Sequence, residues 1–85
     1  MRIVDQIPHD VFTITVFSMN NRYLIKLEAG PMEQTYKLSM DNFKSLEEVR
    51  KFVSERFLGK ARELHNEMFL NLKSELEEFQ KESTR

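Results

Sequence analysis

The chain has 85 residues, no cysteine, and 13 basic against 14 acidic side chains, which give a formal charge of −1. A chain of this length forms one domain with a small hydrophobic core. The lack of cysteine excludes disulfides and thiolate metal sites, and it fits a cytoplasmic protein. Balanced charge argues against nucleic acid as the main partner, because phosphate binding needs an excess of positive charge. No apolar run approaches the length of a membrane span, and the charged N-terminal stretch is not typical of a signal peptide.

The first predicted element is an edge strand over residues 2–7. Asp5 interrupts the alternation of apolar and polar side chains in this segment. The pattern therefore allows a strand here but does not require one. A turn at residues 8–10 follows. There we expect the side chain of His9 to be solvated.

A β-hairpin is predicted over residues 12–29, with Asn20 and Asn21 as its turn. Asparagine tolerates the positive φ that a two-residue type I′ turn requires. That turn sets Val16 opposite Ile25, and it gathers the apolar side chains of both strands on one face. A slip of one residue would mix the two faces, so turn and pattern agree.

A third strand is predicted over residues 35–40, after a four-residue loop over residues 31–34. Pro31 excludes a primed two-residue turn in which it takes the first central position. The four-residue loop sets Glu28 opposite Lys37, whereas a shorter loop would oppose two like charges, Lys26 and Lys37. The strands together form an antiparallel meander of three or four strands.

A long helix is predicted over residues 45–80. Ser45 and Glu48 have the spacing of a capping box. From there, ten apolar residues recur at a mean interval of about 3.67, close to the helical period: Leu46, Val49, Val53, Phe57, Ala61, Leu64, Met68, Leu72, Leu76 and Phe79. The stripe keeps its phase through Gly59, which favours one helix or two nearly collinear pieces. The fold class is thus α+β, with one domain over residues 1–80 (sheet 2–40, helix 45–80) and a flexible tail over 81–85.

The length of this helix predicts a homodimer. Thirty-six helical residues span about 54 Å, whereas an eight-residue strand spans only about 26 Å. The sheet cannot cover the whole stripe, and an uncovered apolar surface indicates a partner. The predicted dimer interface consists of Leu64, Met68, Leu72, Leu76 and Phe79. The alternative is a monomer in which a sharp turn at Gly59 folds the second half of the helix back.

The sequence offers no arrangement typical of catalysis. The two histidines, His9 and His65, lie on different predicted elements, and no glycine-rich phosphate loop is present. We therefore expect no enzymatic activity, cofactor, metal or small-molecule ligand. His65 lies beside the apolar stripe. It is either packed or hydrogen-bonded at an interface, or it forms a pH-sensitive contact.

The polar face of the predicted sheet carries one further hypothesis. Phe17, Arg22, Lys26 and Lys37 share this face or its end. Cations beside an aromatic ring can bind a single-stranded nucleic acid through phosphate contacts and base stacking. The alternative is an ordinary solvent-facing surface.

The segments RYLIKLEAG and TYKLSM, followed by a serine-capped amphipathic helix, resemble the Pur-alpha repeat and the whirly proteins over residues 12–57. The resemblance implies a curved antiparallel sheet of about four strands before a helix, and binding of single-stranded DNA or RNA on the sheet. Under it, Arg22 and Lys26 match the basic strand positions, and Phe17 matches a stacking aromatic. The first prediction is a non-enzymatic dimeric interaction domain, and the alternative is a weak single-stranded nucleic-acid binder.

Overall fold

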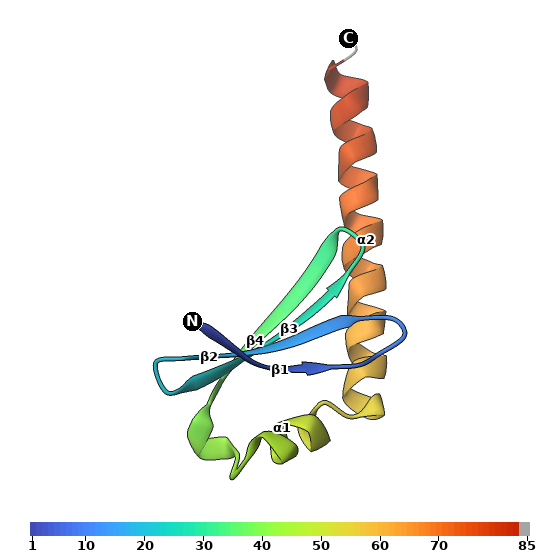
Figure 1. Ribbon diagram of the computed structural model, residues 1–85. Helices are drawn as coiled ribbons and strands as arrows, with labels where there is room; N and C mark the ends of the chain where they lie inside the picture. The colour runs from blue at the N-terminus through green and yellow to red at the C-terminus, as the bar shows by residue number, and fades with distance from the viewer. Residues whose placement is uncertain (84–85) are drawn as a thin grey trace.

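The computed structural model describes residues 1–83. The elements within them are β1 (Arg2–Ile7), β2 (Thr13–Met19), β3 (Arg22–Ala29), β4 (Met32–Ser39), a 3-10 turn (Met40–Asn42), α1 (Leu46–Phe52) and α2 (Glu55–Ser83). The strands form one antiparallel sheet in the order β1-β2-β3-β4. Figure 1 shows α1 lying across one end of the sheet and the long α2 standing beside it. The predicted α+β class, an antiparallel sheet followed by a long C-terminal helix, is confirmed.

The hairpin of β2 and β3 has the predicted turn and register. Asn20 and Asn21 have φ values of 50° and 63°, as a type I′ turn requires at both central positions. Val16 pairs with Ile25, and both side chains are fully buried. The local turn signal and the alternation of side chains were therefore sufficient for this element.

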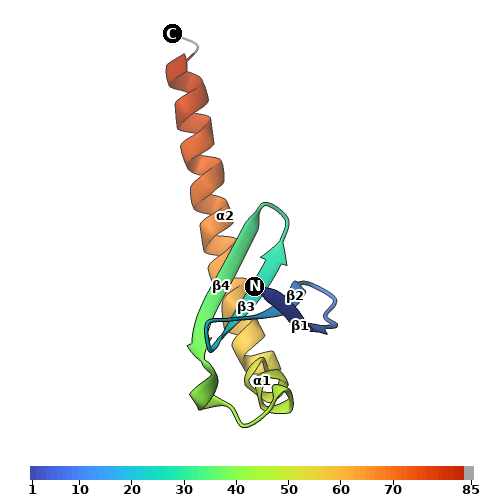
Figure 2. The same cartoon turned by 60° about the vertical axis from the view of Figure 1, so that its left-hand side comes forward.

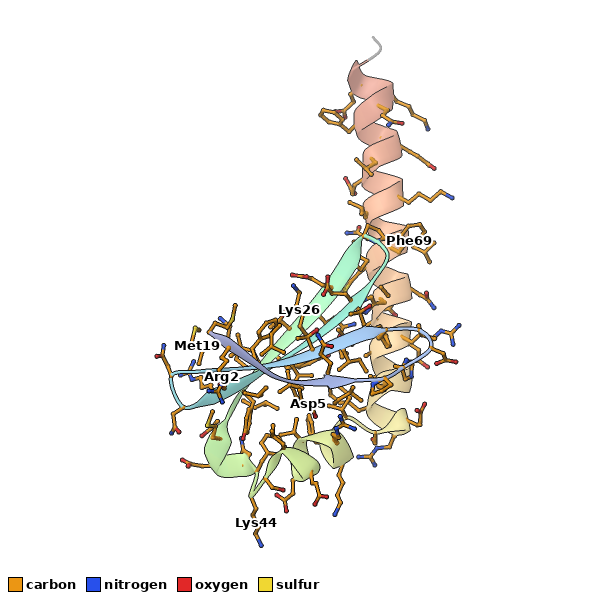
Figure 3. The ribbon with its side chains drawn as sticks, in the orientation of Figure 1. Arg2, Asp5, Met19, Lys26, Lys44 and Phe69 are labelled. Atoms are coloured by element: carbon orange, nitrogen blue, oxygen red, sulfur yellow. The ribbon has the colours of Figure 1, made fainter. Side chains whose placement is uncertain are left out.

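The first edge strand, β1, is present and contains a β-bulge. The register against β2 shifts between Ile3 and Asp5, so Val4 is an extra residue on the bulged strand. The bulge explains the interrupted alternation in the sequence, because it turns Asp5 toward α1 (Figure 3). There Asp5 accepts two hydrogen bonds from the Arg50 side chain, at 2.7 and 2.8 Å.

The predicted four-residue loop between β3 and β4 is wrong. Gly30 and Pro31 alone connect the strands, and Ala29 pairs with Met32. Gly30 has a φ of 58°, as a type II′ turn needs at its first central position. The φ of proline, about −65°, suits the second central position. The prediction excluded Pro31 only from the first central position, so this arrangement was missed.

The shorter turn changes the partners of β4. Lys37 lies opposite Leu24, and Glu28 lies opposite Glu33. The predicted pairing of Glu28 with Lys37 is therefore wrong. The Nζ atom of Lys26 lies 3.7 Å from Glu28 and 3.4 Å from Glu33, so one cation offsets the repulsion between two opposed carboxylates.

The predicted long helix is divided, and the division lies at residues 53–54 instead of Gly59. The backbone N–H of Ser54 donates to Phe52 O at 2.8 Å, and the Ser54 hydroxyl then accepts from Phe57 N at 3.3 Å. This second interaction is an N-cap for α2. Gly59 lies inside α2, so the alternative of a sharp turn at Gly59 is also wrong.

The predicted capping box of α1 is only half formed. Ser45 is the N-cap residue, but its side chain makes no capping hydrogen bond. Glu48 does reach back, and its Oε1 atom accepts from Lys44 N at 2.8 Å. The carboxylate near the start of α1 also suits the positive end of the helix dipole.

The core lies between one face of the sheet and the two helices. Its buried side chains are Phe12, Ile14, Val16, Ile25, Leu27, Val49, Val53, Leu58 and Ala61. Figures 1 and 2 show that α2 continues far beyond the turn between β3 and β4, and the molecule is 56 Å long. The predicted tail began at residue 81, but α2 continues to Ser83; residues 84 and 85 lie outside the described part of the chain.

Candidate interaction surfaces

One face of α2 is apolar along most of its length, although only its first half is covered. Leu58, Ala61 and His65 on this face are 4%, 2% and 6% exposed. Successive helical residues are about 100° apart. Residues 69, 72, 76 and 79 therefore all lie within about 40° of the direction of His65. We call Phe69, Leu72, Leu76 and Phe79 the α2 seam.

The α2 seam is largely uncovered by the protein's own sheet. Phe69, Leu76 and Phe79 are 45%, 49% and 66% exposed, and Leu72 is half-buried. A shallow groove runs along the seam from the β3–β4 turn, lined by Pro31, Phe69, Leu72, Lys73, Leu76, Glu77 and Gln80. Figure 3 shows Phe69 at the level of this turn, where α2 leaves the sheet.

The predicted interface residues do not all lie on the seam. Leu72, Leu76 and Phe79 do, whereas Leu64 and Met68 point about 100° and 60° away from His65 around the helix. Those two side chains are 37% and 38% exposed. Phe69 is not among the predicted interface residues, because it lies off the stripe of the whole segment. The intervals of 3, 4 and 3 residues through Phe69, Leu72, Leu76 and Phe79 were the signal for it.

A buried polar cluster holds the first half of α2 against β4. Gln34 Nε2 donates to Ala61 O at 2.8 Å and to His65 Nδ1. The hydroxyl of Tyr36 donates to Gln34 Oε1 at 2.5 Å. His65 also packs edge-on against Phe12, with ring centroids 4.9 Å apart. Of the two interpretations of His65, a packed, hydrogen-bonded side chain describes what the structure shows.

The cluster leaves one polar atom of His65 without a partner. His65 Nδ1 lies within hydrogen-bond distance of both the Gln34 amide and the carbonyl oxygen of Ala61, so it has a partner whichever ring nitrogen carries the proton. The Nε2 atom of His65 is buried and has no hydrogen-bond partner among the described residues. A buried polar atom without a partner destabilises the folded state by about 1–3 kcal/mol. Gln34 and Tyr36 therefore offset a defect in the interface that they help to form.

His9 has a structural role in the loop between β1 and β2. Its Nδ1 atom accepts from the backbone N–H groups of Val11 and Phe12 at 3.1 and 3.2 Å. The side chain is 13% exposed, so the prediction of a solvated histidine is wrong. The loop turns back onto the core through these two hydrogen bonds.

The face of the sheet that points away from the helices is the open sheet face. Phe17 and Lys37 lie on it on either side of Leu24, with Arg22 on the neighbouring row. A shallow hollow there is lined by Met19, Asn20, Arg22, Leu24 and Lys37. The structure thus brings Phe17, Arg22 and Lys37 together. Lys26 (Figure 3) lies further along, where Glu28 and Glu33 neutralise it.

The ion pair between Asp5 and Arg50 is the one site where the protein shifts a pKa clearly, within the described residues. The hydrogen bonds from Arg50 hold the pKa of Asp5 below its ordinary value, and the Arg50 pKa is raised in turn. The pair joins β1 to α1 and lies away from both surfaces described above. Its role is structural.

Residues that could bind a metal ion do not converge: no three histidine, aspartate or glutamate side chains in the described part of the chain are close enough. No described helix combines the length and apolar character needed to cross a membrane. Comparison of the chain with protein-family models, with curated proteins and with solved structures finds no match. The α2 seam and the open sheet face are therefore the two surfaces that bear on function.

Proposed function

We propose that the protein is a non-enzymatic interaction domain that forms a homodimer, in which a second copy covers the α2 seam. The observation that carries this proposal is the exposure of Phe69, Leu76 and Phe79, at 45%, 49% and 66%, on one face of a helix. Large apolar side chains gathered on one surface indicate an interaction site. A two-fold homodimer is the commonest way to cover such a surface.

The protein's own chain does not supply another cover for the seam. The sheet reaches only the near end of the seam, where Pro31 lines the groove and where Ala29 and Met32 line a second hollow with Phe69. The helix runs without a break from Glu55 to Ser83, so its second half does not fold back over the first. Within residues 1–83, no further element remains to pack there.

The size of the seam predicts a weak dimer. A phenylalanine side chain can bury about 150–250 Å², so Phe69 and Phe79 together offer about 200 Å² of exposed ring surface. Leu72 and Leu76 add less. This area is small beside the roughly 800 Å² that each partner buries in a standard interface. We therefore expect dissociation in the micromolar range.

Sedimentation velocity over the micromolar range tests the proposal. The wild-type chain of 10.2 kDa should sediment at about twice that mass at the upper end of the range. Leu76→Glu should remain monomeric at every concentration, because it places a charge in the seam. Leu70→Glu is the matched control: Leu70 is 63% exposed but points about 140° away from the direction of His65, so this variant should dimerise. A monomeric wild type in the high micromolar range would reject the proposal.

A second candidate function is binding of single-stranded nucleic acid on the open sheet face. It is supported by Arg22 and Lys37, which lie on the same face as Phe17 and form no ion pair with any described residue. Two cations beside an aromatic ring can combine phosphate contacts with stacking. The acidic end of the same face, at Glu28 and Glu33, limits this function to a short oligonucleotide.

Fluorescence polarisation with labelled oligonucleotides at two salt concentrations tests the second candidate. Binding should weaken with salt, and Arg22→Glu or Lys37→Glu should abolish it. Lys44→Glu is the control, because this exposed lysine lies between β4 and α1, away from the open sheet face (Figure 3). Lys26→Glu should have a smaller effect, since Lys26 is already neutralised. Absence of salt-dependent binding in the tens of micromolar would reject this function.

A further inference from the structure

The orientation of the second copy follows from the face of α2 that carries the seam. We propose that the two α2 helices pair antiparallel, with Phe69 of each copy against Phe79 of the other and Leu72 against Leu76. This inference rests on the proposed homodimer and specifies its geometry.

The sheet excludes a parallel pair. Ala61 and His65 point in the same direction as the seam, and Gln34 of β4 hydrogen-bonds to both of these residues. The sheet therefore occupies this face of α2 directly below the seam. A parallel second helix would have to continue along the same face and pass through β4. An antiparallel helix continues in the opposite direction, past the C-terminal end of α2, where the face is open (Figures 1 and 2).

The spacing of the seam selects one antiparallel register. Intervals of 3, 4 and 3 residues are those of two facing helices with alternating core positions. When Phe69 lies opposite Phe79, Leu72 lies opposite Leu76, and all four layers between the helices are apolar. If the second helix is shifted by seven residues toward the sheet, Phe79 of one copy lies opposite Arg62 of the other, beneath the sheet. The same shift outward leaves only Leu76 and Phe79 in contact.

This register also defines the surroundings of the seam. Phe79 of the second copy reaches the end of the groove where Pro31 and Phe69 lie, so the β3–β4 turn becomes part of the interface. On one flank the two Lys73 side chains approach each other near the two-fold axis, with Glu77 of each copy beside them, so attraction and repulsion offset each other. On the other flank the two Glu75 side chains approach each other near the two-fold axis. The charges at the flanks therefore add little net affinity, and the apolar layers determine binding.

Distances between spin labels on the two copies distinguish the orientations. The chain has no cysteine, so a single substitution labels one position. In the proposed antiparallel pair the two-fold axis is level with Ser74. Residue 60 lies 14 residues from this level in each copy, so labels at Lys60→Cys are separated by at least about 42 Å, at 1.5 Å per residue. Labels at Ser74→Cys stay within about 30 Å, because they lie across two adjacent helices. Both positions are exposed and lie off the seam.

The expected result is a long distance at Lys60→Cys and a short distance at Ser74→Cys. Short distances at both positions would show a parallel pair and overturn this inference, while the proposed homodimer would stand. If neither position shows dipolar coupling and the protein has a monomeric mass, both the proposed homodimer and this inference are rejected.

A double-mutant cycle tests the register. Phe69 and Phe79 are about 15 Å apart along one helix, so they do not contact each other within a chain. Phe69→Ala and Phe79→Ala should each raise the dimer Kd several-fold, and the double variant should raise it by less than the product of the two factors. The control pair is Phe69→Ala with Leu70→Ala, because Leu70 lies off the seam. Full multiplicativity for Phe69 and Phe79 would overturn the register.

Discussion

The two halves of α2 have the same apolar period, but the sheet buries the apolar face of the first half and leaves that of the second half exposed. In the half that covers the sheet, Leu58 and Ala61 are 4% and 2% exposed; in the other half, Leu76 and Phe79 are 49% and 66% exposed. The difference arises from the length of the sheet, not from the helix. Helical periodicity therefore identifies an apolar face, but it does not say whether the same chain or another chain covers that face.

The largest expected effect is the difference in free energy of unfolding between truncating a buried core side chain and truncating a seam side chain. Ile25→Ala should lower the free energy of unfolding by about 2–5 kcal/mol, because it leaves a cavity in the core, where Ile25 is 0% exposed. Leu76→Ala should change it by about 0.5 kcal/mol or less when the protein is monomeric. Urea unfolding at low protein concentration measures both. Equal losses would mean that the monomer already covers the seam.

The polar cluster that secures the covered half of α2 is the next target. Gln34→Leu should lower the free energy of unfolding by about 1–3 kcal/mol, since His65, Tyr36 and Ala61 lose a hydrogen-bond partner. Tyr36→Phe is the milder control, because it removes one hydroxyl and leaves the bonds from Gln34 to α2. Thermal unfolding followed by circular dichroism measures the two losses. A neutral Gln34→Leu would show that apolar packing alone holds this half of α2.

The two glycines, Gly30 at the seam end of the sheet and Gly59 in the covered half of α2, should respond with opposite signs. Gly30→Ala should lower the free energy of unfolding by about 1–2 kcal/mol, because Gly30 has a φ of 58°. Gly59→Ala should raise it by up to about 1 kcal/mol, because nothing lies within 4 Å of the added methyl group. Chemical denaturation of the pair measures both changes. A destabilising Gly59→Ala would contradict an unstrained, continuous α2.

The smallest effect concerns the ion pair between Asp5 and Arg50, at the end of the sheet far from the seam. Arg50 lowers the pKa of Asp5 from its ordinary 3.8. The stability from this shift is therefore present above about pH 4 and is lost as pH falls through the lowered pKa. Asp5→Asn should be slightly less stable than wild type at neutral pH.

A pH series of thermal unfolding checks this prediction, with both proteins measured side by side. The difference in stability between wild type and Asp5→Asn should shrink below about pH 4. Dimerisation should not change, because the pair does not contact the seam. A difference that stays constant down to pH 2 would contradict the role assigned to Arg50.

Much of the fold was predictable because its signals are local. Asn20 and Asn21 define a turn by their own conformational preference, and the flanking residues agree with the resulting register. The β3–β4 turn was not predictable in this way. Pairing of Glu28 with Lys37 favoured a longer loop, and only the folded sheet shows that Lys26 neutralises Glu28 and Glu33 together.

The candidate site was predictable in part for a related reason. Leu72, Leu76 and Phe79 were expected at an uncovered surface because helix and strand lengths are simple consequences of residue number. Phe69 was left out of the predicted interface because it lies off the stripe of the whole segment, although the spacing within α2 includes it. The break rotates α2 relative to α1, so the phase of the seam has to be read from α2 alone.

By itself the sequence determined the order of the elements, the hairpin of β2 and β3, and an apolar helix longer than its sheet, because each depends on neighbours in the chain. The tertiary structure alone decided the turn at Gly30 and Pro31, the break before Ser54, and the burial of His65 against Gln34. The turn and the break are each one of several local solutions that the sequence allows, and packing of the helices on the sheet selects between them. The burial of His65 depends on Gln34, a residue far away in the sequence.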